Sequence, residues 1–107
     1  MVNSFKKWLL KNFEHNELVD IANYGAQNGF HGLIYYSETT KLYRQYKENI
    51  WDMLYEDADS QGLTVTELID SFNGSKNVNN EDQFENLLVW YAAEKVAWEV
   101  TECEYQN

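Results

Sequence analysis

Hydrophobic residues recur at helical spacing along most of the chain. Near its start, Phe5, Trp8 and Leu9 follow an i, i+3, i+4 pattern. This pattern predicts an amphipathic helix over residues 4–12, with Ser4 as its N-cap. A second helix is predicted over residues 16–28.

The third predicted helix is the longest and covers residues 38–60. Its core-facing stripe consists of Leu42, Tyr46, Ile50, Met53 and Leu54. At 100° per residue these positions spread over about 120°, the width of a buried face on a globular helix. Ser37 precedes the helix and is suited to cap it.

Two further helices are predicted in the second half of the chain. Thr64 and Glu67 form a capping box in front of a helix over residues 65–73, and Gly62 is placed to end the preceding helix. The last helix is predicted over residues 81–104. Its expected apolar face comprises Phe84, Leu87, Leu88, Tyr91 and Trp98.

Composition supports a mainly all-α fold. The chain of 107 residues has no proline and only five glycines, whereas a β-domain of this size needs many turns. We therefore predict one compact domain over residues 1–107, a bundle of about five helices. Only residues 30–36, between two predicted helices, favour a short irregular or β-like segment.

Charge is distributed unevenly along the chain. The net charge is −10, but residues 1–47 carry a balance of +2 and residues 48–107 a balance of −12. An acidic domain repels nucleic acid and anionic membranes, so direct nucleic-acid or membrane binding is not expected. Basic protein surfaces are the expected partners, and the oligomeric state is left open.

The stretch DADSQGLTVTEL, residues 57–68, begins like an EF-hand calcium loop. Asp57, Asp59 and Gln61 occupy positions 1, 3 and 5 of that register. Position 12 requires a bidentate carboxylate but is occupied by Leu68. The same residues are explained by a helix end and a capping box, so no metal or other cofactor is expected.

Catalytic groups are scarce, and we expect no enzyme. His31 lies in an aromatic neighbourhood typical of a packing role, and Cys103 lies near a chain end that is expected to fray. One cysteine cannot form an intrachain disulfide, which favours a reducing compartment. No secretory or membrane-spanning run is present, so the expected location is the cytoplasm.

The most specific polar pattern is a row of acids in the third predicted helix. Glu48, Asp52, Glu56 and Asp59 lie within about 80° of one another, opposite the apolar stripe, and successive carboxylates are about 6 Å apart. Lys41, Arg44 and Lys47 precede them, an order that opposes the helix macrodipole. Such a row either keeps the protein soluble or imitates a line of phosphates.

Aromatic residues offer a second route to a partner. Tyr35, Tyr36 and Trp51 belong to a dense aromatic region, and Trp51 falls away from the apolar stripe. An exposed tryptophan beside acids is typical of a protein-binding hot spot. The alternative is that Trp51 packs beneath another helix.

In size, acidity and helical composition the chain resembles small phage-encoded inhibitors. This resemblance extends over most of the chain and includes the segment GFHGLIYYSETTKLYRQYKENIWDMLYEDADSQG, residues 29–62, which is similar to uncharacterised small phage proteins. It implies an antirestriction or anti-CRISPR type of inhibitor that mimics DNA in the host cytoplasm. The expected function is non-catalytic binding to a basic, nucleic-acid-binding host protein; the alternative is a helical adaptor or assembly module that docks through its aromatics.

Overall fold

The computed structural model describes residues 4–24, 36–73 and 81–105, and these form five helices. They are α1 (Ser4–Asn12), α2 (His15–Tyr24), α4 (Tyr36–Gln61), α5 (Val65–Asn73) and α6 (Glu81–Tyr105). No strand occurs within those three ranges, which confirms the all-α prediction. Residues 25–35 lie outside the described part of the chain, and with them all but the last residue of the predicted irregular segment.

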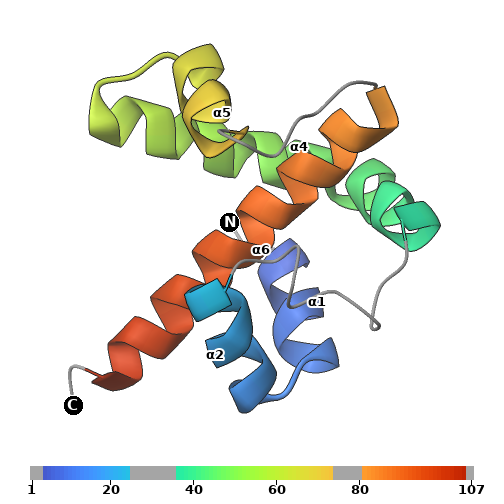
Figure 1. Ribbon diagram of the computed structural model, residues 1–107, viewed down its shortest axis with the longest axis vertical. Helices are drawn as coiled ribbons and strands as arrows, with labels where there is room; N and C mark the ends of the chain where they lie inside the picture. Colours follow the sequence, from blue (N-terminus) through green and yellow to red (C-terminus); the bar gives the residue numbers. More distant parts are fainter. Residues whose placement is uncertain (1–3, 25–35, 74–80, 106–107) are drawn as a thin grey trace.

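Helix α6 is the central element of the fold. It runs diagonally across the molecule, packing mainly against α2 and α4 and also contacting α1 and α5 (Figure 1). Because neighbours cover it on several sides, α6 buries residues around most of its circumference instead of along one stripe. The buried apolar residues are Leu87, Leu88, Val89, Trp90, Ala92, Ala93, Val96 and Ala97.

One residue of the predicted α6 face was assigned wrongly. Trp98 is 55% exposed, whereas Val89 and Val96, which the single-stripe pattern omitted, are buried. The amphipathic pattern assumes that one face of a helix is buried, whereas a helix at the centre of the fold has several buried faces. The exposed tryptophan lies in the part of α6 that extends towards the C-terminal end of the chain.

Helix α1 packs against α4 through an aromatic contact and a hydrogen bond. The ring of Phe5, itself fully buried, meets Tyr46 edge-on at 5.7 Å. The Phe5 amide donates a hydrogen bond to Oδ1 of Asn49 at 2.8 Å. A side chain of α4 thus satisfies one of the free amides at the start of α1.

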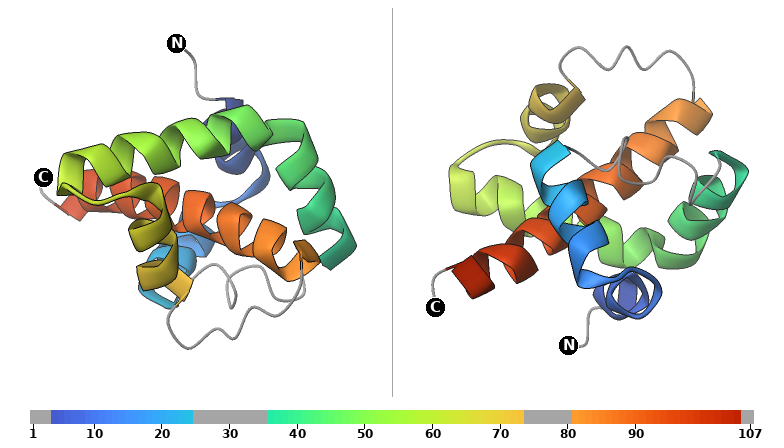
Figure 2. Two further views of the ribbon diagram at one scale, coloured as in Figure 1. Left: turned by 90° about the horizontal axis from the view of Figure 1, so that it is seen from above. Right: turned by 60° about the horizontal axis from the view of Figure 1, so that its bottom comes forward.

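Helix α4 is bent at Tyr46, whose φ of −114° and ψ of 20° are not helical. The left panel of Figure 2 shows the two segments meeting at an angle. Neither proline nor glycine occurs in α4, so the bend is held by contacts across it. The indole N–H of Trp51 donates a hydrogen bond to the Tyr43 hydroxyl at 3.0 Å, and Tyr46 itself packs on α1.

The junction between α4 and α5 has the predicted helix stop and start. Gly62 has a φ of +70°, its amide reaches the Asp59 carbonyl at 3.2 Å, and the Leu63 amide reaches the Ala58 carbonyl at 2.9 Å. This pair of bonds is a Schellman motif. The Thr64 amide then binds the Glu67 carboxylate at 2.9 Å, and the Glu67 amide binds the Thr64 hydroxyl at 3.1 Å. The predicted capping box is therefore confirmed.

Replacing Thr64 with alanine should lower the free energy of unfolding by about 1 kcal/mol, because an amide at the start of α5 loses its acceptor. Hydrogen bonds to the Glu67 carboxyl from the backbone and the side chain of Thr64 hold the pKa of Glu67 below its ordinary value. Urea denaturation followed by circular dichroism measures the change. Thr66→Ala, at an exposed position two residues further along, is the matched control, and equal midpoints for the two variants would contradict the cap.

Candidate functional site

The four predicted acids form a continuous exposed row on α4. Glu48, Asp52, Glu56 and Asp59 are all solvent-exposed, and all follow the bend at Tyr46. They therefore share one straight helical segment and keep the register that the sequence predicts. From the first residue to the last, the row spans eleven helical steps, about 16 Å. We call these four residues the acidic row.

The opposite side of the same segment is anchored in the core. Ile50 and Leu54 are fully buried, and Met53 is 6% exposed. A helix whose back is packed to this extent holds the Cα positions on its front at a fixed spacing. The acidic row is therefore a rigid feature of the surface.

The bend changes the electrostatic interpretation of α4. In one straight helix, Arg44 and Lys47 ahead of the acids would oppose the macrodipole. In the bent helix, Arg44 lies in the last turn of the first segment and Glu48 in the first turn of the second, and both positions are favourable. Lys47, in the first turn of the second segment, and Asp59, near its C-terminus, remain in unfavourable positions.

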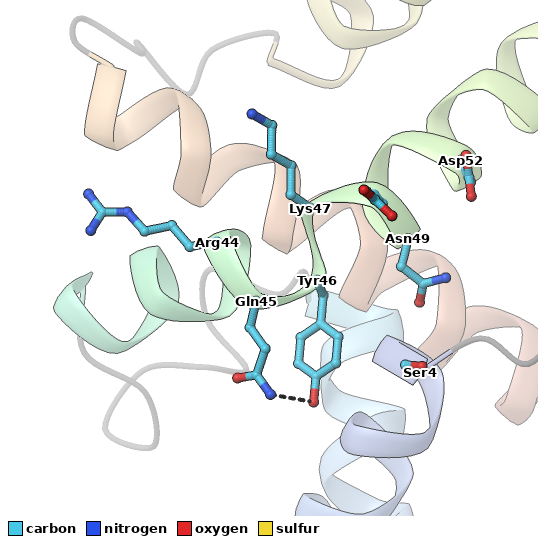
Figure 3. Close-up of a pocket in the computed structure, with 8 residues that line it drawn as sticks. Ser4, Arg44, Gln45, Tyr46, Lys47, Asn49 and Asp52 are labelled. Atoms are coloured by element: carbon cyan, nitrogen blue, oxygen red, sulfur yellow. Dashed lines mark hydrogen bonds between the residues drawn. The ribbon is translucent and has the colours of Figure 1, made fainter.

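A hollow of about 430 Å³ opens beside the bend, where basic and acidic side chains meet. Arg44, Lys47, Glu48 and Asp52 are among its lining residues. Asn49 projects towards Ser4 at the start of α1 (Figure 3). The Lys47 ammonium also lies 6.0 Å from the centre of the Tyr43 ring. The beginning of the acidic row thus borders the basic part of α4.

The aromatic residue that the acidic face exposes is Tyr55, which the sequence analysis did not single out. Tyr55 is 59% exposed. Asp52 lies three residues before it and Asp59 four residues after it, so both carboxylates are its neighbours on the helix surface. The ring centre of Tyr55 is 6.0 Å from that of Trp51. The signal was its position in the helical wheel, about 20° beyond the edge of the acidic arc and away from the apolar stripe.

The three aromatics predicted as a docking surface are placed differently from Tyr55. Trp51 is half-buried, packs against the core and is hydrogen-bonded to Tyr43 across the bend. It therefore braces α4. Tyr35 lies outside the described residues, as does the side chain of Tyr36, so their part of the prediction stays a prediction.

Asp57, the first residue of the calcium-like stretch, belongs to a polar cluster between α4 and α6. Its carboxylate accepts hydrogen bonds from the Tyr91 hydroxyl and the Lys95 ammonium. Lys95 also lies 3.4 Å from Glu99, one turn further along α6. The Phe72 ring of α5 meets the Tyr91 ring edge-on at 5.3 Å, so three helices meet at this cluster.

This arrangement gives the calcium-like residues other roles. Asp57, Asp59 and Gln61 all lie within α4, where Asp59 points away from the face that Asp57 and Gln61 share. Among residues 4–24, 36–73 and 81–105, no three histidine, cysteine or acidic side chains are grouped closely enough to hold a metal ion. His15 is exposed, and His31 and the Cys103 side chain lie outside the described part.

Protonation of the cluster is coupled to folding. Burial raises the pKa of the Tyr91 phenol, and the hydrogen bond and charge of Asp57 raise it further. Burial alone would lower the pKa of Lys95, but the hydrogen bond and charge of Asp57, together with Glu99, raise it on balance. Both groups therefore keep their protons to higher pH in the folded chain than in the unfolded one.

Stability should consequently fall as pH rises above the ordinary pKa of tyrosine, 10.0. Above this value the unfolded chain loses protons that the folded chain retains, and unfolding becomes easier. In Tyr91→Phe the decline should be shallower by about 1 kcal/mol per pH unit. Urea denaturation at pH 9, 10 and 11 measures both slopes, and parallel declines would show that Tyr91 is not the linked group.

The fold and this surface define a class: a small all-helical domain that displays an exposed acidic face. Within the described residues no helix is long and apolar enough to cross a membrane. The chain belongs to the family described as a domain of unknown function, DUF7222, whose model matches residues 2–104. No curated protein and no solved structure matches it.

Proposed function

We propose that this protein is a non-catalytic binding protein whose acidic row occupies a basic surface of a nucleic-acid-binding protein in the host cytoplasm. The observation that carries the proposal is the row itself: four carboxylates at regular spacing, all exposed, on a helix whose other side is buried. The balance of −12 over residues 48–107 favours the same kind of partner.

The spacing of the row can be compared with that of a nucleic acid. The three intervals between these four charges average about 5.5 Å along the helix, whereas one DNA strand carries a phosphate per about 3.4 Å of axis. A duplex carries twice as many. The row therefore imitates a single strand of phosphates better than a whole duplex, and the partner we propose has a channel or groove that follows one strand.

The row is also a cost to the fold. Acids four residues apart repel one another by a few tenths of a kcal/mol per pair, and Asp59 opposes the helix dipole. Replacing all four by their amides should therefore raise the free energy of unfolding slightly. A surface that lowers stability and is nevertheless rigidly presented is the pattern expected of a binding site.

Competition with DNA tests the proposal. A restriction enzyme and a CRISPR effector are each mixed with labelled DNA, and the release of DNA by this protein is titrated. The row variant Glu48→Gln, Asp52→Asn, Glu56→Gln, Asp59→Asn should weaken inhibition at least about tenfold, because each contact with a basic surface loses its charge.

The matched control is Glu14→Gln, Asp20→Asn, Asp70→Asn, Glu81→Gln. It removes the same charge from exposed acids outside the row and should change inhibition by no more than about twofold. Equal losses in the two variants would show that net charge acts and the row does not. Inhibition that persists undiminished without the row would rule out strand mimicry.

The second candidate function is a helical adaptor or assembly module that docks through aromatics. It is favoured by two large exposed rings, Tyr55 and Trp98, at 59% and 55% exposure. Salt separates the two functions, since binding by the acidic row should weaken steeply between 50 and about 200 mM salt, whereas aromatic docking should hardly change.

A further inference from the structure

Tyr55 stands in an unusual environment for an exposed tyrosine. The face around it is anionic, with Asp52 and Asp59 as its helical neighbours and Glu56 next in sequence. Its ring leans on Trp51, which is itself fixed by the hydrogen bond to Tyr43. More than half of the Tyr55 surface remains open to solvent. Its orientation is thus supported from behind while its outer face is free.

A surface hollow adjoins Tyr55 at the corner between α4 and α5. Its lining residues are Tyr55, Glu56, Ala58, Asp59, Leu63 and Val65. Ala58 is buried, while Leu63 and Val65 are half-buried and form the apolar part of the surface. Glu56 and Asp59, both exposed, supply the carboxylates. The Schellman motif at Gly62 fixes Leu63 against the end of α4, so the hollow is built into the corner.

We propose that this hollow is the receptor for an arginine side chain of the protein partner. The guanidinium would stack on the open face of Tyr55 and pair with Glu56 or Asp59, and its aliphatic stem would lie on Leu63 and Val65. Charge complementarity selects a cation, and the combination of an aromatic face with an apolar floor selects the cation that is planar and weakly hydrated. A lysine ammonium can use the carboxylates but gains less from the ring.

This inference rests on the proposed function, since it names the chemistry by which a basic partner recognises the acidic row. It adds a specificity that charge alone lacks. The row attracts any basic surface, whereas the Tyr55 hollow distinguishes arginine-rich from lysine-rich surfaces. It also makes Tyr55 the central contact of the interface, where aromatic residues concentrate binding energy.

Two nine-residue glycine–serine peptides test the inference; one carries three arginines, and the other carries three lysines at the same positions. Titration calorimetry measures the binding of each peptide to the whole chain. The arginine peptide should bind roughly fivefold to tenfold more tightly than the lysine peptide. Tyr55→Ser should remove this difference, and Tyr55→Phe should keep it, because stacking requires the ring and not the hydroxyl. Trp98→Ala, which removes the exposed tryptophan of α6, should leave it unchanged.

The outcomes separate this inference from the function on which it rests. Equal binding of both peptides, weakened by the amide row variant, would leave the acidic row in place and overturn the arginine receptor. The receptor would also be overturned if an arginine preference survived Tyr55→Ser. Binding of both peptides that is indifferent to the amide row variant would overturn the proposed function as well. Because Tyr55 is exposed, Tyr55→Ser should fold, and an unchanged circular dichroism spectrum verifies this.

Discussion

Replacing Asp57 with alanine should lower the free energy of unfolding by about 3 kcal/mol. Asp57 is the shared acceptor of Tyr91 and Lys95, and its side chain is only 14% exposed. Without it, the hydroxyl of half-buried Tyr91 loses its acceptor, and Lys95, whose side chain is 27% exposed, keeps only the exposed Glu99 at 3.4 Å. Removing the main acceptor of a partly buried ammonium costs more than losing a surface ion pair, which contributes at most about 1 kcal/mol.

The comparison that makes this prediction specific is Asp59→Ala. Both substitutions remove one acid from the same end of α4, but Asp59 is exposed and should change stability by less than about 0.5 kcal/mol. The midpoints of urea unfolding measure both stability changes, provided that the dependence of the unfolding free energy on urea is the same in both variants. In addition, the double variant Asp57→Ala, Lys95→Met should lose less stability than the sum of the two single variants, because Lys95→Met removes the ammonium that has lost its main acceptor. If the two stability losses were strictly additive, the interaction between Asp57 and Lys95 would be contradicted.

Leu54→Ala should also lower the free energy of unfolding by about 3 kcal/mol. Leu54 is fully buried, so truncation forfeits its transfer energy and leaves a cavity that the packed helices cannot fully close. It lies on the side of α4 that faces away from the acidic row. At temperatures where the variant is folded, its affinity for a basic partner should therefore equal that of the original chain.

This separation of stability from binding is measurable in one experiment. The amide row variant should bind the basic partner more weakly and unfold at a slightly higher urea concentration. Leu54→Ala should bind with unchanged affinity and unfold at a lower urea concentration. Titration calorimetry at 15 °C and urea unfolding at the same temperature give the two quantities. If Leu54→Ala lost affinity while its circular dichroism spectrum stayed native, the acidic row could not be a preformed surface.

Much of the fold follows from the sequence because the local signals agree with one another. The capping box of Thr64 and Glu67, the glycine stop at Gly62 and the apolar period of α1 all predict boundaries that the structure has. Each of these signals acts within one or two turns of helix. Local chemistry of this kind does not depend on which other helix is nearby.

The features that the sequence did not predict depend on contacts between distant segments. The bend at Tyr46 is held by the ring of Phe5 in α1 and by the hydrogen bond from Trp51 to Tyr43. No proline or glycine in α4 indicates it in the sequence. The wider burial of α6, and with it the exposure of Trp98, follows from the number of helices that surround it. Spacing within one helix carries no information on its neighbours.

The candidate site divides in the same way. The acidic row could be predicted because its members share one helix, and the structure places all four in solvent. Asp57 lies next to two of them in sequence but faces Lys95, which is 38 residues away, so its role could not be read from α4 alone. Tyr55 was overlooked because a tyrosine among apolar and acidic residues is ambiguous until its exposure is known.

The bend at Tyr46 has a consequence for how the molecule approaches a partner. Lys41, Arg44 and Lys47 are exposed on one side of the bend or at it, and the acidic row extends away from it, so positive and negative charge are separated along α4. Such a separation gives the domain an electric dipole. The field of a positively charged surface, such as that of the proposed partner, would exert a torque on this dipole and turn the acidic end forward before contact. Fewer collisions then fail through misorientation, and the association rate rises without any new bond.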